Sequence, residues 1–256
     1  MPRYFLEVSY KGTHYSGFQT QQNANTIQAE IEKAFAIILR QQIIMTGSSR
    51  TDAGVHALQN FFHFDTILPL QQWRGIVDEA DVIYKLSAIL PDDIVAKRIL
   101  QVNDDSHCRF DAVSREYNYY IYRHKNPFLK DTAFFFPYTL DVEKMKQAAA
   151  IIKEHTDFTS FSKRNTQAKT FVCKIEESKW LLQDNCLVYD VKSNRFLRGM
   201  VRALVATILK IGRGKLSLDE FRAIIEAKDC TRASFAVPAH GLFLMKVDYP
   251  QTDSNK

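Results

Sequence analysis

Residues 47–57 read GSSRTDAGVHA and follow the apolar run Ile43-Ile44-Met45. The apolar run predicts a short buried strand that ends at Gly47. Gly54 allows the positive φ that brings a backbone close to a ligand. Asp52 is then expected to project from the tip of the loop, two residues after the cation of Arg50. This pattern is typical of a catalytic loop.

The tripeptide Asp52-Ala53-Gly54 also fits an ordinary turn in which the aspartate caps its own backbone. The longer motif separates the two interpretations. Residues 50–57, RTDAGVHA, closely resemble the signature of the TruA family of tRNA pseudouridine synthases. The resemblance implies that Asp52 is the catalytic residue.

The composition indicates a globular protein with one large domain or two of ordinary size. The chain has 256 residues, and the 46% that are hydrophobic supply substantial cores. The four cysteines form no CxxC pair and have no ligand-spaced histidines nearby, so neither a zinc site nor a disulfide framework is expected. A signal-peptide pattern and a membrane-length apolar run are both missing, and we expect a cytoplasmic protein without a membrane partner.

The charge is divided unevenly along the chain. Residues 1–105 carry 9 Lys and Arg against 12 Asp and Glu, a balance of −3. Residues 106–256 carry 25 against 17, a balance of +8. A basic second half favours contact with phosphate, although many lysines on helices only form a solvated face.

Strands and helices alternate in the predicted secondary structure. Apolar and alternating patterns predict strands at Arg3–Tyr10, Asn60–Asp65, Ile94–Val102, Tyr117–Arg123, Thr170–Gln183, Cys186–Ser193 and Leu242–Tyr249. Helical periodicity predicts helices from Thr26 to about Arg40 and at Val82–Leu90, Asp141–Glu154, Leu197–Ile211 and Ser217–Ala227. The polar, glycine-containing segment Lys11–Gln21 is expected to be a surface loop.

This mixture of elements predicts an α+β fold. The polar segment 103–106 suggests a boundary between an N-terminal half, residues 1–105, with the aspartate loop, and a C-terminal half, residues 106–249, followed by a tail at 250–256. The resemblance implies two RRM-like α/β halves, whose antiparallel sheets form a joined platform around a central active-site cleft.

A tyrosine-rich strand supports the resemblance. In residues 115–122, REYNYYIY, Tyr117 and Tyr119 share one strand face, and Tyr120 and Tyr122 share the other. Tyrosines often pack a sheet while the hydroxyl stays wet, so most of these are expected to be structural. The resemblance implies that Tyr117 stacks near the target base, with Arg115 completing the family's Arg-x-Tyr pattern.

A basic motif lies at residues 195–202, RFLRGMVR. Its arginines, Arg195, Arg198 and Arg202, stand at i, i+3 and i+7, which predicts a basic stripe on a helix. Without the family context, a solvated helix face would be the better explanation of such a stripe. The segment resembles the family pattern Phe-Leu-x-x-Met-Val-Arg, which implies that Arg202 pairs with Asp52. A neighbouring arginine favours the ionised carboxylate and fixes its direction.

Two further segments extend the resemblance over almost the whole chain. Residues 237–244, VPAHGLFL, resemble the family's Pro-Ala-x-Gly-Leu-x-Leu ending, and residues 11–19 follow an early family pattern. Phe18 stands where tryptophan is usual, and Ser49 replaces a common glycine. Arg198-Gly199 replaces bulkier polar pairs. These departures leave every proposed catalytic group in place.

The resemblance implies conversion of uridine to pseudouridine at positions 38, 39 and 40 of the tRNA anticodon stem-loop, by a homodimer. It implies no metal and no organic cofactor, and the histidines His14, His56 and His63 lack metal-ligand spacing. Arg50 is expected to orient the loop and help extrude the base. Arg115, Arg195 and Arg198 are expected to bind substrate.

Two other classes fit parts of the sequence. A noncatalytic RNA-binding protein could use the same sheet and basic helices, but it has no need for an acidic side chain in its RNA cleft. An aspartate-dependent hydrolase or phosphotransferase would be expected to have further metal-binding carboxylates near Asp52, and the loop lacks them.

Overall fold

The computed structural model describes residues 1–164, 166 and 168–250. These residues form two compact units, one made of Met1–Val113 and the chain from Leu244 onward, the other of Ser114–Phe243. The tail expected at 250–256 lies outside the described residues from position 251 on. The functional boundary expected near residues 103–106 stays a prediction.

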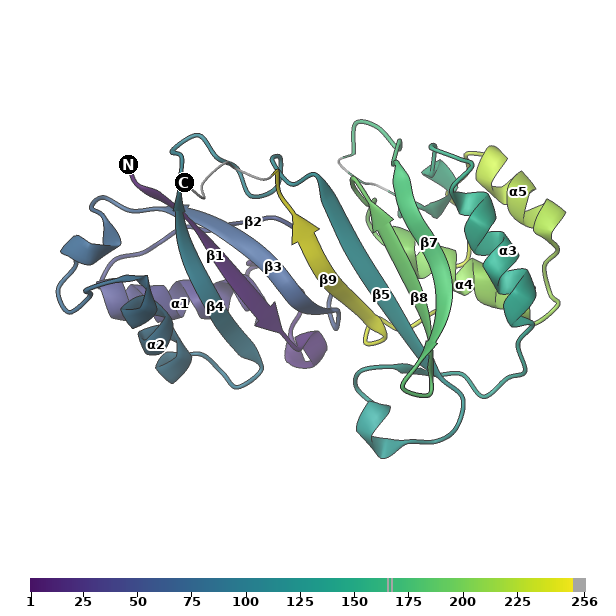
Figure 1. Ribbon diagram of the computed structural model, residues 1–256, viewed down its shortest axis with the longest axis horizontal. Helices are drawn as coiled ribbons and strands as arrows, with labels where there is room; N and C mark the ends of the chain where they lie inside the picture. The colour runs from purple at the N-terminus through teal and green to yellow at the C-terminus, as the bar shows by residue number, and fades with distance from the viewer. Residues whose placement is uncertain (165, 167, 251–256) are drawn as a thin grey trace. The chain divides into compact units, whose positions relative to one another are not determined.

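The first unit has an antiparallel sheet with β1 at its centre (Figure 1). Its elements are β1 (Arg3–Tyr10), α1 (Ile27–Leu39), β2 (Thr46–Gly47), β3 (His56–Asp65), α2 (Glu79–Ile89) and β4 (Ile94–Val102). β1 pairs with β3 on one side and β4 on the other, and β2 pairs with β3. The central position explains why β1 is buried almost throughout, from Tyr4 to Val8.

In the second unit, β8 lies between β5 and β7 and pairs antiparallel with both. Its elements are β5 (Ser114–Tyr122), β6 (Phe134–Phe135), α3 (Val142–Ile152), β7 (Ile175–Gln183), β8 (Cys186–Ser193), α4 (Met200–Gly212) and α5 (Leu218–Glu226). α3 packs on β7, α4 and α5. α4 is apolar on almost every side and is correspondingly buried.

The last strand is β9 (Leu242–Asp248), and from Leu244 onward it belongs to the first unit and packs there. The Val247 N–H donates to Gln59 Oε1 at 3.0 Å, and the Tyr249 ring meets Phe61 edge-on at 5.2 Å. Short 3₁₀ helices complete the fold: η1 (Gly12–His14), η2 (Leu70–Gln72), η3 (Pro127–Leu129) and η4 (Thr159–Phe161).

Most predicted elements are confirmed, and three strands, β1, β4 and β8, have the predicted bounds. Helix α1 begins after Thr26, whose hydroxyl accepts the Ala29 N–H at 3.3 Å, and ends at Arg40 in the left-handed region with φ 52°. The predicted strand Ile43–Met45 is wrong: the paired residues are Thr46–Gly47, and Ile44 is exposed.

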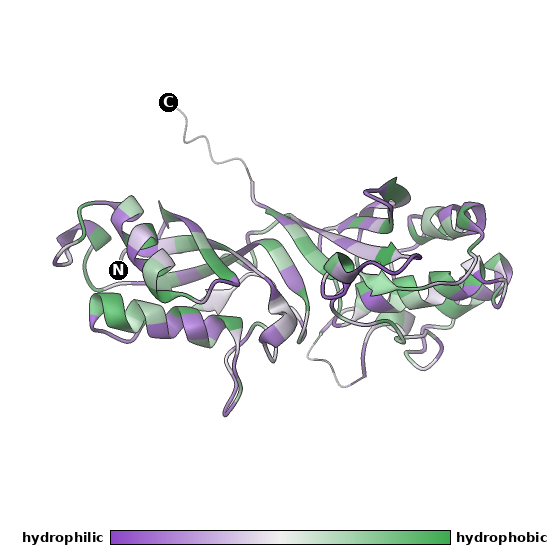
Figure 2. Cartoon of the chain, turned by 90° about the horizontal axis from the view of Figure 1, so that it is seen from below, coloured by the Kyte–Doolittle hydropathy of each residue, from purple (hydrophilic) through white to green (hydrophobic). Residues whose placement is uncertain are grey.

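The expected α+β class agrees with this architecture, since largely antiparallel sheets and five α-helices occur in the described chain. Figure 2 shows hydrophobic and hydrophilic residues on the same helices, as expected of helices that cover a core with one side. Across the residues that the structure describes, every helix is too short or too polar to cross a membrane.

Helix α5 begins with a reciprocal capping box, which generates a stability prediction. The Glu220 N–H donates to Ser217 Oγ at 3.1 Å, and the Ser217 N–H donates to Glu220 Oε2 at 2.7 Å. We expect Ser217→Ala to lower the free energy of unfolding by about 1 kcal/mol, because a backbone N–H of the first turn loses its acceptor. Urea unfolding measures the change.

Ser87→Ala is the matched control, since the Ser87 hydroxyl only donates back to the Ile83 carbonyl within α2. Its loss should be nearly neutral. Equal destabilisation by the two substitutions would contradict the capping role of Ser217.

Candidate active site

The aspartate loop lies between β2 and β3. Asp52 is half-buried, while Thr51 and Val55 on either side of it are buried. The Val55 N–H donates to the Asp52 carbonyl at 3.2 Å, and Gly54 has φ 78°. The turn therefore needs the glycine predicted from the sequence.

A buried network of polar side chains holds this loop. Tyr10 Oη lies 2.8 Å from Thr51 Oγ1, and the Asn60 amide donates to Tyr10 Oη at 3.1 Å and to the Ser49 carbonyl at 2.9 Å. Ser48 Oγ donates to Asn60 Oδ1 at 2.7 Å. β1, β3 and the loop are thus joined through one amide and one phenol.

Sequence reasoning missed this network. A signal was available, because Asn60 is an amide inside an apolar strand and is fully buried. Buried amides require hydrogen-bond partners, so its position pointed to polar groups nearby.

The segment 11–21 was expected at the surface, and the structure corrects this. Gly12, Tyr15, Gly17 and Phe18 are buried. A Cβ on Gly12 would lie 2.0 Å from the Val55 carbonyl oxygen, so only glycine fits there. This segment packs directly beneath the aspartate loop.

Hydrogen bonds of backbone N–H groups also join this segment to the aspartate loop. The Phe18 N–H donates to the Thr51 carbonyl at 3.2 Å. The Gly12 N–H donates to Nδ1 of His56 at 3.0 Å, and His56 is buried. His56 thereby joins the segment after β1 to the aspartate loop, with Nδ1 as acceptor.

The Phe18 ring is enclosed between two elements. It stacks on Phe62 with ring centroids 4.5 Å apart and planes 11° from parallel. A Cβ on Gly47 would lie 2.0 Å from Phe18 Cε1. The ring at position 18, where the family usually has tryptophan, therefore packs against β2 and β3 in the core behind the aspartate loop.

In the second unit, β5 carries Arg115 and Tyr117. Arg115 is buried, and its Nη1 donates to the Asn194 carbonyl at 3.1 Å, just beyond the end of β8. Tyr117 is half-buried and meets Phe196 edge-on at 5.1 Å. Both residues therefore lie against the segment that connects β8 to α4.

The other tyrosines of β5 make packing contacts, as expected. Tyr119 is fully buried, Tyr120 meets Phe243 edge-on at 5.2 Å, and Tyr122 packs with Phe135.

The predicted helical stripe of three arginines is wrong. Only Arg202 lies in α4; Arg195 and Arg198 precede it. The reason is Gly199, the N-cap residue, whose φ of 76° is left-handed and interrupts any helix before Met200. Arg195 is half-buried and Arg198 is exposed.

Arg202 is hydrogen-bonded to the segment before β9. Its Nε and Nη2 donate to the Val237 carbonyl at 3.1 and 2.7 Å. The Tyr119 hydroxyl donates to the next carbonyl, that of Pro238, at 2.7 Å. A Cβ on Gly241 would lie 2.7 Å from Tyr119 Cζ, so this glycine allows the close approach.

Comparison with known proteins shows which family the chain resembles. A sequence profile described as tRNA pseudouridine synthase matches residues 7–111 and 154–250. The chain belongs to the tRNA pseudouridine synthase family. The membership confirms the predicted enzyme class, an isomerase that acts on tRNA.

Relatives named tRNA pseudouridine synthase A match the chain over nearly its full length. The protein of Porphyromonas gingivalis is 44% identical over 252 residues, covering 98% of each chain, and that of Parabacteroides distasonis is 43% identical over 251 residues, covering 98% of this chain and 97% of its own. The protein of Staphylococcus aureus strain N315 is 36% identical over 249 residues, covering 96% and 90%.

The candidate residues of this synthase are distributed over the two units. Arg50 and Asp52 lie in the first unit, and the second unit contains Arg115, Tyr117, Arg195, Arg198 and Arg202. Arg50 is exposed on the aspartate loop. The pairing of Arg202 with Asp52 joins residues of different units and stays a prediction.

The polar network generates a test of loop positioning in the synthase. Tyr10→Phe removes the hydroxyl that joins Thr51 and Asn60, so the loop should lose its alignment and pseudouridine formation should slow by roughly tenfold or more. The loss of stability should be about 1–2 kcal/mol. Single-turnover assays and urea unfolding measure the two effects.

Tyr4→Phe is the matched control. It removes the same group from the same strand, where the Tyr4 hydroxyl accepts the Leu70 N–H at 3.1 Å. It should cost similar stability and leave the rate unchanged. Equal rates for the two variants would remove the positioning role from Tyr10.

Proposed function

We propose that this enzyme converts uridine to pseudouridine at positions 38, 39 and 40 of the tRNA anticodon stem-loop, with Asp52 as the catalytic group. The observation that carries the proposal is the setting of Asp52. Its side chain is half-buried on a loop whose neighbours Thr51 and Val55 are buried and hydrogen-bonded on two sides. A carboxylate held in this way meets a substrate with little loss of conformational freedom.

The chemistry requires the target uridine to leave its stack before its glycosidic bond becomes reachable. Asp52 then promotes cleavage of the bond between N1 and the ribose, and the detached uracil turns and rejoins the sugar through C5. Direct attack of Asp52 on the sugar and assistance to elimination both use one carboxylate next to a retained base.

Three residues support that carboxylate in the proposal. Tyr117 supplies a half-exposed ring on which a flipped base regains stacking. Arg50, exposed on the same loop as Asp52, helps extrude the base. Arg202 keeps Asp52 ionised, and its hydrogen bonds to Val237 hold the guanidinium in one direction.

Of the remaining candidates, Arg195 and Arg198 bind RNA directly in this proposal and Arg115 supports them. Arg198 is exposed and Arg195 half-exposed, next to Phe196 and Tyr117, so their charges would neutralise phosphates beside the target. Arg115 is buried and acts by holding the chain after β8. The excess of basic residues after position 105 supports the same assignment.

The wider expectations belong to the same proposal. The element order β1-α1-β2-β3-α2-β4, with sheet order β4-β1-β3 and β2 beside β3, supports an RRM-like first half. We further propose a cytoplasmic homodimer that binds tRNA across both subunits, with a central cleft between the halves of each chain.

A hydrolase or phosphotransferase is less well supported. Among the described residues, no cluster of three or more metal-binding side chains includes Asp52. A noncatalytic RNA-binding role conflicts with membership in a synthase family.

The first test compares the native enzyme with Asp52→Asn. We expect the native enzyme to form pseudouridine at positions 38 to 40 of unmodified tRNA and the variant to form none, while tRNA binding is kept. Carbodiimide adducts read by primer extension map the modified positions. Asp92→Asn, which changes an exposed aspartate in a turn, is the control and should stay active.

Two results would contradict the proposal in different ways. Signal at other uridines would keep the chemistry and overturn the site, whereas an active Asp52→Asn enzyme would remove Asp52 from catalysis.

The second test concerns Arg202. Arg202→Ala should lower the single-turnover rate on the order of a hundredfold, since the carboxylate loses both its counter-charge and its alignment. The control is Arg222→Ala, because Arg222 is a half-exposed arginine of α5 that pairs with Glu154, just after the end of α3. An unchanged single-turnover rate for Arg202→Ala would refute its role.

A further inference from the structure

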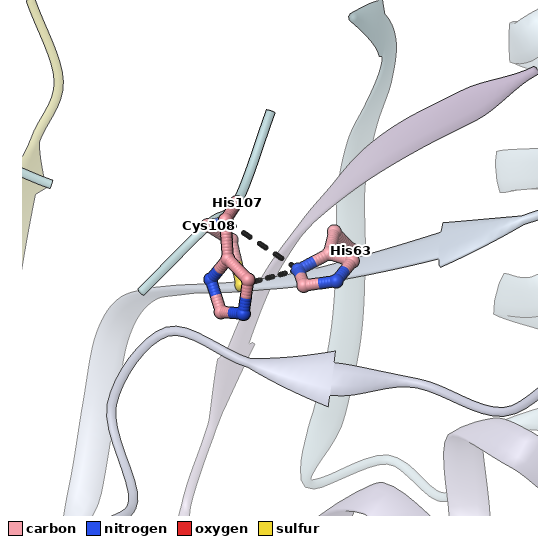
Figure 3. Close-up of side chains that lie close together, drawn as sticks. All are labelled: His63, His107 and Cys108. Atoms are coloured by element: carbon pink, nitrogen blue, oxygen red, sulfur yellow. Dashed lines mark hydrogen bonds between the residues drawn. The ribbon is translucent and has the colours of Figure 1, made fainter. Parts of the chain in front are cut away.

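Two histidines and one cysteine meet in the first unit, away from the aspartate loop. His63 belongs to β3, and His107 and Cys108 belong to the segment after β4. One ligand atom of each lies within 4.8 Å of the other two, and Figure 3 shows the three side chains turned toward one another. Cys108 is fully buried and His63 is 8% exposed.

We propose that His63, His107 and Cys108 bind a structural Zn²⁺ ion, with water in the fourth position. Imidazole nitrogen and thiolate sulfur are the donors that zinc prefers. Zinc bonds of about 2.3 Å to sulfur and about 2.0 Å to nitrogen place tetrahedral ligands roughly 3.5 Å apart. The separation of His63 Nδ1 from Cys108 Sγ is 3.2 Å, so this pair would need to move apart by only a few tenths of an ångström, and His107 has a ligand atom within 4.8 Å of both.

The three side chains have charged neighbours whose effects oppose one another. Burial, together with the neighbouring His107 and Arg3, lowers the pKa of His63 to about 4. The Arg3 guanidinium is paired with Asp65 through two bonds of 2.8 Å, which offsets its charge. Asp111 adds a carboxylate, which accepts the backbone N–H of His107 at 2.7 Å.

Binding would cost existing hydrogen bonds and one proton. His63 Nδ1 would lose the bond that it accepts from the Cys108 backbone N–H at 3.4 Å. His107 Nδ1 accepts the Arg109 N–H at 3.1 Å, and this bond must be given up if His107 ligates through Nε2 with its proton on Nδ1. The Cys108 thiol, which lies 3.1 Å from the Thr46 carbonyl, must lose its proton, and one proton is released for each zinc bound. Zinc affinity should therefore rise with pH.

The ion would fasten the chain that leaves β4 onto β3. Other contacts already hold this segment: Arg3 donates to the Ser106 carbonyl at 2.9 Å, and the Tyr249 hydroxyl donates to the Cys108 carbonyl at 2.6 Å. His63 is seven residues along β3 from His56, roughly 23 Å at strand spacing. Zinc here would stabilise the first unit without entering the proposed reaction.

The test uses the full chain stripped of metal by a chelator. Addition of Zn²⁺ in competition with a chromophoric chelator should show one ion per chain, release of one proton and a higher melting temperature. Co²⁺ in its place should give the near-ultraviolet charge-transfer band of a thiolate ligand. His107→Ala should weaken zinc binding by roughly tenfold or more, at least the effect of losing an outer-shell partner.

Cysteine variants identify the sulfur ligand. Cys108→Ser should abolish the cobalt band, whereas Cys230→Ser, which changes a half-buried cysteine of the second unit, should keep it. If Cys108→Ser does not fold, the cobalt band of the native chain and the higher cobalt concentration that His107→Ala needs to develop it decide the question. Failure of the native chain to bind zinc, or a band that survives in Cys108→Ser, would overturn the proposal. Pseudouridine assays play no part in these readouts.

Discussion

The hydrogen bonds of the Asn60 amide are the interaction on which the proposed site depends. Asn60 sits in β3, yet its side chain reaches Tyr10 of β1 and the Ser48 and Ser49 residues of the loop. A buried amide without partners would cost about 1–3 kcal/mol, so each partner holds the others in place. The network fixes the backbone of the loop and so positions Asp52, although none of these hydrogen bonds is made to the Asp52 carboxylate.

The second unit uses backbone carbonyls in a similar way. Arg202 of α4 and Tyr119 of β5 each donate to one of two successive carbonyls, those of Val237 and Pro238. The segment before β9 is therefore fixed by a helix and a strand together. An arginine anchored by part of its guanidinium keeps a defined direction for the interaction we propose with Asp52.

Local chemistry was readable from the sequence, and distant contacts were not. Thr26 and Ser217 mark helix starts because an N-cap acts within three residues, and β1, β4 and β8 have clear apolar limits. The spacing of Arg195, Arg198 and Arg202 wrongly predicted one helical stripe, because Gly199 begins the helix between the second and third arginine. The burial of Gly12 depends on Val55, and the approach of Cys108 to His63 depends on how the chain after β4 returns to β3, so neither follows from neighbours in sequence.

The contact between Gly12 and Val55 has a consequence for building hybrid enzymes. A side chain at position 12 would collide with the backbone of the aspartate loop, and Phe18 fills the space that Gly47 leaves open. Residues 12–18 and 47–62 therefore behave as one interlocked module despite their separation along the chain. Fragments exchanged between relatives would keep this geometry only if both segments came from the same parent.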